Sequence, residues 1–138
     1  MNRSARRLMA FFMLSLTTAV ATADVTAGYY RQPAIFNDGV VFVAEGDLWR
    51  AGLSGGVAQR LTSNLAAESN PAVSPDGKWV AFTARYEGPA EVYVMPLGGG
   101  APIRLTFEGD TASVQGWTAD GKVLYATQRY SGKPDTRL

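Results

Sequence analysis

The sequence predicts an all-β fold: a partial β-propeller of four-stranded antiparallel blades, about two and a half blades long, preceded by an N-terminal signal helix. Two observations carry this prediction. Short apolar runs follow tight turns at regular intervals, and whole segments recur with a period near 44 residues. The composition agrees with it, because 15 glycines, 7 prolines, 3 tryptophans, 6 tyrosines and 6 phenylalanines suit many short strands joined by turns.

The recurring segments define the repeat unit. Gln32–Gly39 (QPAIFNDG) returns 38 residues later as Asn70–Gly77 (NPAVSPDG). Three further pairs stand 44 residues apart: Asp47–Arg50 and Glu91–Val94, Leu53–Gly56 and Leu97–Gly100, and Arg60–Thr62 and Arg104–Thr106. The difference between 38 and 44 is six residues, which we place in the connection Arg85–Pro89, because loops tolerate insertions.

Each unit is predicted to contain four strands. The first is Pro-Ala-Ile or Pro-Ala-Val, the third surrounds Trp49 or Tyr93, and the fourth is Arg-Leu-Thr. The second strand follows an Asp-Gly pair, at Val40–Ala44, Trp79–Ala84 and Val123–Thr127. The predicted blades span residues 30–65, 68–109 and 112–138. The last blade is truncated in its third strand, at Asp135–Leu138, so we expect a fragment of a ring, prone to aggregate through its open blade edges if it is made alone.

The Asp-Gly pairs are assigned to structural turns. They are Asp38-Gly39, Asp76-Gly77 and Asp120-Gly121. The carboxylate can accept hydrogen bonds from the following backbone N–H groups, and the glycine tolerates a positive φ. The alternative of acid–base or calcium chemistry is disfavoured by their repetition in turns.

The N-terminal segment predicts export. Arg3, Arg6 and Arg7 precede the apolar stretch Leu8–Val20, and Ala21-Thr22-Ala23 follows as a small-x-small cleavage site. We therefore assign residues 1–23 to a signal peptide cleaved after Ala23, and residues 24–138 to a periplasmic or secreted propeller portion with no stable membrane anchor. An uncleaved anchor and a twin-arginine route are the alternatives.

The residues that are absent restrict function. The 138 residues include no cysteine and no histidine, which excludes disulfides, thiolate chemistry, histidine metal ligands and a Ser-His-Asp triad within this chain. We expect no catalytic residue, no cofactor and no metal. Thirteen Lys and Arg residues face twelve Asp and Glu residues without a basic stripe, so a nucleic acid partner is not expected either.

Two groups of side chains remain to be placed. Trp49, Trp79 and Trp117 are expected to pack between blades, because their large apolar areas are most readily buried there. The pairs Arg85-Tyr86 and Arg129-Tyr130 end the second strands of their units, 44 residues apart, at the same rim. Local packing in the hairpin and contact with a peptide both stay open for these four residues.

The repeat pattern resembles a known group of propellers. NPAVSPDGKWVAF, EVYVMPLGGG and PIRLT are similar to the WD40-like repeats of the TolB and tricorn protease group. AEGDLWR, YEGP, GWTADG and ATQRYS, at residues 44–50, 86–89, 116–121 and 126–131, resemble the N-terminal propeller of exported bacterial tricorn-type peptidases. The resemblance covers nearly all of residues 28–138.

This resemblance implies an ancillary part of a protease. Members of the group continue into further blades, a PDZ-like domain and a C-terminal serine peptidase domain, and their propellers are thought to pass unfolded peptides to the proteolytic site. It therefore implies a peptide or unfolded polypeptide as partner, together with the remaining domains of the parent chain and assembly of several copies. The alternatives are a TolB-like periplasmic protein-binding scaffold and the propeller of a prolyl-oligopeptidase-type enzyme.

Overall fold

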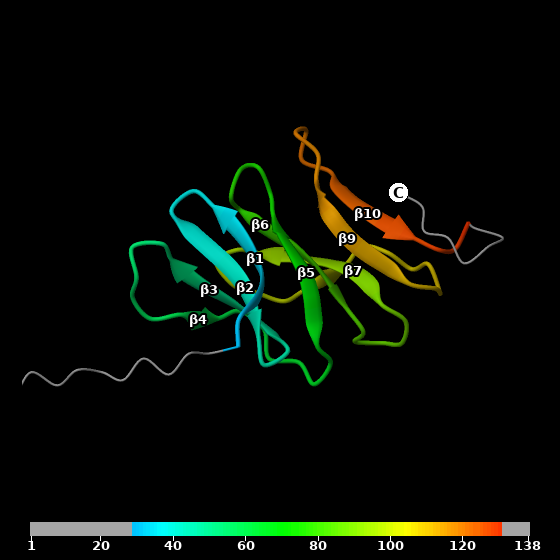
Figure 1. Cartoon of the computed structure of the whole chain (residues 1–138). Helices are drawn as coiled ribbons and strands as arrows, with labels where there is room; N and C mark the ends of the chain where they lie inside the picture. Colours follow the sequence, from blue (N-terminus) through cyan, green and yellow to red (C-terminus); the bar gives the residue numbers. More distant parts are fainter. Residues whose placement is uncertain (1–28, 131–138) are drawn as a thin grey trace, which may run out of the picture.

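A computed structural model of the chain describes residues 29–130. The predicted signal peptide, its cleavage after Ala23 and the truncated strand at Asp135–Leu138 lie outside the described residues and stay predictions. The described part contains ten strands in three antiparallel sheets and no helix, which confirms the all-β prediction (Figure 1). No helix suited to crossing a membrane occurs between residues 29 and 130.

The strands follow the chain from one side of each sheet to the other. Blade 1 contains β1 (Arg31–Phe36), β2 (Gly39–Ala44), β3 (Asp47–Gly52) and β4 (Gln59–Arg60). Blade 2 contains β5 (Glu68–Val73), β6 (Trp79–Ala84), β7 (Glu91–Pro96) and β8 (Ile103–Arg104). Blade 3 contains β9 (Ala112–Trp117) and β10 (Val123–Thr127). The sequential order in both complete sheets confirms the four-stranded blade.

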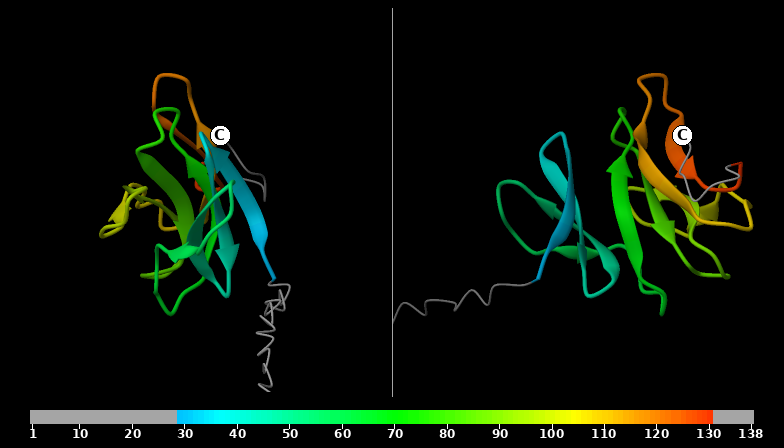
Figure 2. Two further views of the ribbon diagram at one scale, coloured as in Figure 1. Left: turned by 90° about the vertical axis from the view of Figure 1, so that its left-hand side faces the viewer. Right: turned by 45° about the vertical axis from the view of Figure 1, so that its right-hand side comes forward.

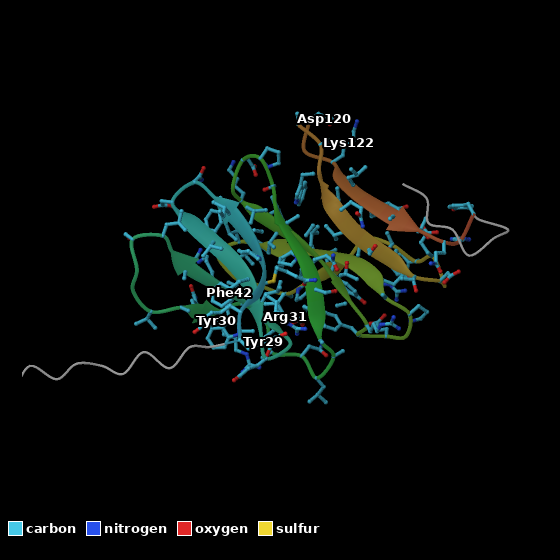
Figure 3. The ribbon with its side chains drawn as sticks, in the orientation of Figure 1. Tyr29, Tyr30, Arg31, Phe42, Asp120 and Lys122 are labelled. Carbon is cyan, nitrogen blue, oxygen red and sulfur yellow. The ribbon has the colours of Figure 1, made fainter. Side chains whose placement is uncertain are left out.

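The three blades stand side by side as separate sheets (Figure 2). β5 contacts both β1 and β9, so the first strands of the three blades form one continuous inner wall. We call β1, β5 and β9 the inner strands. The turns between the first and second strands lie on one rim, where Asp120 and Lys122 are found, and Tyr29 and Tyr30 lie at the opposite end of blade 1 (Figure 3).

The six-residue difference between the first two blades is divided between two connections, so the prediction that it lies wholly in Arg85–Pro89 is wrong. β2 and β3 are joined by the two residues 45–46, whereas β6 and β7 are joined by the six residues 85–90. The other two extra residues lie in the first turn. Phe36 pairs with Gly39 across two residues, and Ser74 pairs with Trp79 across four.

The first Asp-Gly pair therefore differs from the other two. Gly77 and Gly121 have φ of 70° and 83°, the left-handed conformation predicted for the turn glycine. Gly39 instead belongs to β2, and Asn37 takes the positive φ, at 37°. A Cβ on Gly39 would lie 2.5 Å from the Phe36 ring. Gly39 still closes the predicted turn, but it is required for space beside an aromatic ring and not for a positive φ, which corrects the reason given for this glycine.

The fourth strands are shorter than the predicted Arg-Leu-Thr segments, at two residues each. The next residue still pairs, since the Leu61 N–H donates to the Leu48 carbonyl at 2.8 Å. The threonines then replace the backbone. Thr62 Oγ1 accepts the Leu48 N–H at 2.8 Å and Thr106 Oγ1 accepts the Val92 N–H at 2.9 Å. A side-chain hydroxyl thus ends each outer strand.

Two apolar clusters hold the blades together. The larger lies between blades 1 and 2 and consists of Val41, Val43, Leu48, Val80, Phe82, Ala84, Tyr93, Met95 and Leu97. The smaller lies between blades 2 and 3 and consists of Ala81, Val92, Val94, Ala112 and Val114. Trp117 packs against this second cluster as predicted. Trp79 is 38% exposed and lines a hollow with Trp117 of blade 3. The prediction fails for Trp49, which lies with Tyr30 and Phe42 of its own blade around a cavity of about 300 Å³.

Each inner strand carries a β-bulge at its pairing with the second strand. The register shifts between Arg31 and Ala34 in β1, between Ser69 and Ala72 in β5, and next to Gly116 in β9. Gln32 and Asn70 occupy equivalent bulge positions with φ of 50° and 51°. Side chains at these positions leave the regular alternation of the strand.

Candidate functional site

The predicted site residues lie on two different rims. Asp38, Asp76 and Asp120 occupy the turns of one rim, where Asp76 Oδ1 accepts the Ser74 hydroxyl at 2.6 Å and the Lys78 N–H at 3.1 Å. Arg85, Tyr86, Arg129 and Tyr130 follow β6 and β10 on the other rim. The structure brings Tyr86 into a site between blades 1 and 2. It leaves Arg85 exposed, and Arg129 lies 5.5 Å from the centroid of the exposed Tyr130 ring.

Hydrogen bonds and ion pairs hold Asp76 and Asp120 in place. Ser74 Oγ also accepts the Trp79 N–H at 3.0 Å, and Lys122 pairs with Asp120 at 2.7 Å. The hydrogen bond from Ser74 and then that from the Lys78 N–H lower the pKa of Asp76, and the Lys122 side chain lowers that of Asp120. Both carboxylates are therefore ionised and engaged within their own turns.

Tyr86 is fixed between aromatic rings and a buried carboxyl group. Its ring centroid lies 4.8 Å from that of Tyr93 and 6.3 Å from that of Phe82. Its hydroxyl donates to Glu68 Oε1. Burial and the hydrogen bond to Glu68 raise the Tyr86 pKa far above its ordinary value, so the phenol stays neutral.

Glu68 and Asp47 form a buried pair of acids next to Tyr86. Both side chains are almost fully buried, and Glu68 Oε2 accepts the Thr62 hydroxyl at 2.9 Å. Arg60 donates to Asp47 Oδ2, whereas Asp47 Oδ1 is buried with no hydrogen-bond partner among residues 29–130. Burial raises the Glu68 pKa, with a further contribution from the Asp47 charge, against the hydrogen bonds from Tyr86 and Thr62. The pair connects the end of blade 1 to the start of β5.

A matching cluster lies one repeat later, around Glu91. Its carboxylate accepts hydrogen bonds from Arg104 at 2.9 Å, from the Gly109 N–H at 3.3 Å and from the Thr106 hydroxyl. Burial alone would raise the Glu91 pKa, but these three donors outweigh it and lower the pKa. Arg104 also pairs with Glu87 at 3.0 Å and lies 4.5 Å from the centroid of Phe107.

Tyr86, Glu87 and Arg104 border a cleft of about 480 Å³ between blades 1 and 2. It is lined by Leu61, Thr62, Ser63, Asn64, Tyr86, Glu87, Tyr93, Gly100, Pro102 and Arg104. Tyrosine faces, hydroxyl and amide groups, and one charge of each sign meet there, a combination suited to binding peptide groups and mixed side chains. No group of three or more His, Cys, Asp or Glu arranged to hold a metal occurs in the part of the chain that the structure describes.

Sequence reasoning missed the buried acids. Asp47 and Glu91, Arg60 and Arg104, and Thr62 and Thr106 are all 44 residues apart, so the recurrence itself was a usable signal. Glu68 has no acidic counterpart, because Ala112 occupies the equivalent place in blade 3. Only the packing of β5 against the end of blade 1 shows that Glu68 joins the cluster.

Separate four-stranded sheets joined along an inner wall define the class of protein as a β-propeller. The chain belongs to the family described as the tricorn protease N-terminal β-propeller domain, which matches residues 27–137. Over 104 residues it is 42% identical to tricorn protease homolog 1 of Streptomyces coelicolor, covering 75% of this chain and 10% of the relative. It is also 34% identical over 120 residues to the Tol-Pal system protein TolB of Desulfosudis oleivorans, covering 84% of this chain and 27% of TolB.

A solved structure supports the same assignment. The crystal structure of the tricorn protease superposes with a TM-score of 0.68 at 25% identity, over 77% of this chain and 11% of the protease. The chain thus spans about a tenth of the length of these two tricorn relatives. These comparisons confirm the resemblance to the tricorn and TolB propellers that the repeats indicate.

Proposed function

We propose that this chain is the non-catalytic opening part of a propeller in an exported tricorn-type serine protease. In this proposal it binds or gates peptide substrates before they reach a peptidase domain elsewhere in the parent chain. The match of residues 27–137 to the tricorn N-terminal propeller family carries the proposal. The chain has no histidine or cysteine, so its own residues are suited to binding rather than to nucleophilic catalysis.

The geometry supports a role in peptide binding. The inner strands β1, β5 and β9 form a continuous wall, and the 480 Å³ cleft offers aromatic and polar groups side by side. Binding of an unfolded chain requires many modest contacts rather than one deep pocket, because extended segments expose main-chain and side-chain groups along their whole length. We infer that unfolded polypeptides bind better than folded proteins.

Fluorescence anisotropy tests this function directly. A fluorescein-labelled, chemically unfolded polypeptide is titrated with the purified chain, and the same polypeptide in its folded state is the control. Light scattering first establishes that the chain is monomeric, because its open blade edges favour aggregation. We expect a saturable rise in anisotropy for the unfolded form only, and no cleavage of the labelled polypeptide over the same period. Equal affinity for both forms, or none for the unfolded form, would contradict the proposal.

A TolB-like protein-binding scaffold is the second candidate. The 34% identity to TolB over 84% of this chain favours it. Such a scaffold would bind a folded partner protein, so preference for folded protein in the same titration would favour this candidate. The prolyl-oligopeptidase alternative predicts a Gly-x-Ser-x-Gly motif in the coding sequence that follows Leu138.

We also propose export through the segment 1–23. The arginines before an apolar stretch and the small residues Ala21 and Ala23 support it. Mass spectrometry of the protein isolated from the periplasm or medium should give Asp24 as the first residue. Recovery of the uncleaved chain with the membrane fraction would contradict this assignment.

A further inference from the structure

The inner strand of blade 2 is an edge strand, and three of its backbone groups are bonded to neighbouring blades. β5 pairs only with β6 within its sheet, which leaves its other edge facing the neighbouring blades. Such an edge normally offers unpaired N–H and C=O groups to which an extended polypeptide can add as a further strand. Whether β5 can accept a further strand therefore depends on whether the N–H and C=O groups on this edge already have hydrogen-bond partners.

Both neighbouring blades contribute caps to this edge. The Glu68 N–H donates to the Gly46 carbonyl at 2.7 Å, and the Asn70 N–H donates to Gln32 Oε1 at 2.9 Å. Two residues further on, the Ala72 carbonyl accepts the indole N–H of Trp117 at 2.9 Å. Between these residues, Pro71 has no N–H to offer. Three backbone groups of β5, on Glu68, Asn70 and Ala72, are thus engaged before any ligand arrives.

Side chains are what this edge leaves accessible. A hollow of about 210 Å³ spans all three inner strands and is lined by Gln32, Pro33, Asn70, Pro71, Ala72, Val114 and Gln115. Three of these residues carry carboxamides, one from each inner strand, and all three are exposed. Gln32 uses its oxygen on Asn70, and Gln115 donates to Ser113 at 3.2 Å, so each retains further hydrogen-bonding capacity.

The chemistry of this inner hollow matches a peptide main chain. A carboxamide has the same donor and acceptor groups as a peptide unit, so it pairs with either the N–H or the C=O of an extended chain. None of the lining residues is charged, which gives no preference for anionic or cationic ligands. The bulges with φ of 50° and 51° place Gln32 and Asn70 at equivalent positions of neighbouring blades.

We propose that the inner hollow contacts the main chain of extended polypeptides through Gln32, Asn70 and Gln115, while the capped edge of β5 prevents those polypeptides from adding as a strand. This inference rests on the proposed peptide-binding function and specifies its mode. Contact through a few carboxamides is weak and independent of peptide sequence, whereas strand addition would form a continuous ladder. A passing chain would be held loosely and released.

Two uncharged peptides distinguish these modes. A Gly-Ser repeat exposes almost only main chain, and a Thr-Val repeat of equal length favours strand formation. Titration of the ¹⁵N-labelled chain is followed by NMR through the side-chain amide signals. We expect both peptides to shift the Asn70 and Gln115 side-chain signals, with affinities that agree within about twofold. A Thr-Val peptide that binds more than about tenfold tighter and protects β5 amides from exchange would show strand addition and overturn the inference.

Variants then test the carboxamides. Asn70→Gly removes the side chain at a positive φ that glycine tolerates, and Gln115→Ala removes the second carboxamide. Each should weaken binding of both peptides about fivefold, the effect of one hydrogen bond. Gln59→Ala removes an exposed carboxamide from the outer strand β4 and should leave binding unchanged. Far-UV circular dichroism checks the fold of each variant.

The failure of this inference can be told from failure of the proposed function. If the peptides shift the backbone amide signals of Tyr86 and Arg104 in the cleft but not the side-chain amide signals of Asn70 and Gln115, the proposed peptide binding holds. The inner hollow is then not the binding site. If neither peptide nor the unfolded polypeptide shifts any signal, the proposed function fails and this inference fails with it.

Discussion

The junction between blades 1 and 2 buries aromatic rings, and we call it the aromatic junction. The junction between blades 2 and 3 buries only Ala and Val, with Trp117 and Tyr125 partly buried against them, and we call it the small junction. Phe82, Tyr86 and Tyr93 stack on one face of blade 2, with Phe82 and Tyr93 centroids 5.9 Å apart. On the other face of the same blade, Ala81 and Val92 meet Ala112 and other small residues of blade 3. One sheet therefore uses its two faces differently, although the repeat spacing is the same on both sides.

The buried acids of the two junctions differ in the same way. Glu91 alone satisfies Arg104, Thr106 and the Gly109 N–H. Asp47, at the equivalent position, is one methylene shorter and reaches Arg60 but leaves Oδ1 without a partner in residues 29–130. Glu68 enters from the next blade and accepts the Thr62 hydroxyl instead. Two carboxyl groups thus perform at the first junction what one performs at the second.

The comparison shows how an inexact repeat retains its function in packing. The outer-strand Arg and Thr are constant at 44 residues, and the acid that meets them is free to come from either side of the junction. The first junction therefore buries Glu68 next to Asp47, whose Oδ1 has no partner in residues 29–130. Burying such groups in a low-dielectric interior is unfavourable. The first junction offsets this cost with a larger apolar cluster.

The largest expected effect comes from the aromatic junction. Phe82→Ala removes a ring that is fully buried and should lower the free energy of unfolding by about 3–5 kcal/mol. Val114→Ala, in the small junction, should cost about 1–2 kcal/mol, because only two carbons leave the core. Urea unfolding followed by tryptophan fluorescence measures both. A loss for Phe82→Ala no larger than that for Val114→Ala would refute the comparison.

Exchanging the acids should have a smaller effect. Glu91→Asp shortens the carboxylate so that it cannot serve all three donors, and at least one buried donor is left unpaired. We expect a loss of about 1–3 kcal/mol. Asp47→Glu lengthens the side chain, so the carboxylate oxygen that has no partner can approach a donor. This exchange should lower the free energy of unfolding less than Glu91→Asp does, or not at all. Equal losses for the two exchanges in urea unfolding would contradict the view that one carboxyl group serves the donors of the second junction and two serve those of the first.

Most of the fold follows from the sequence because it depends on local patterns. The apolar runs at Trp79–Ala84 and Val123–Thr127 have the predicted bounds, and turn residues separate them as expected. The placement of Gly39 and of the six extra residues did not follow. Two-residue and four-residue turns both fit an Asp-Gly dipeptide, and only the pairing of Phe36 with Gly39 shows which one forms.

The candidate site was predictable in part only. Tyr86 was identified through its repetition with Tyr130, but the two residues differ in environment, since Tyr130 is 67% exposed. The packing of Tyr86 depends on Glu68, an acid that the repeat does not contain. Contacts between blades join residues distant in sequence, so one unit examined alone does not indicate them.

A hydroxyl in the second junction gives a test of intermediate to small size. Thr83 Oγ1 accepts the Val114 N–H at 2.9 Å in a buried place, and Gln32 serves the equivalent Asn70 N–H in an exposed one. Thr83→Val should cost about 1–2 kcal/mol, because the buried N–H then has no partner. Gln32→Ala should cost less than about 0.5 kcal/mol, since water replaces the lost acceptor. If Gln32→Ala lowered the free energy of unfolding more than Thr83→Val, the junction between blades 1 and 2 would depend on the hydrogen bond from the Asn70 N–H to Gln32.

The pH dependence of stability should have opposite signs for the two buried glutamates, and it is the smallest effect expected here. Burial raises the Glu68 pKa above 4.5, so its contribution is complete below that pH and is lost as the pH rises through the folded-state pKa. Hydrogen bonds lower the Glu91 pKa, so its contribution is present above 4.5 and is lost as the pH falls. Glu68→Gln should therefore flatten the neutral side of the stability profile, and Glu91→Gln the acidic side. Urea midpoints measured from about pH 3 to about pH 7 distinguish them. If Glu68→Gln changed only the acidic side of the stability profile, Glu68 would be ionised in the folded chain. The raised pKa of Glu68 would then be contradicted.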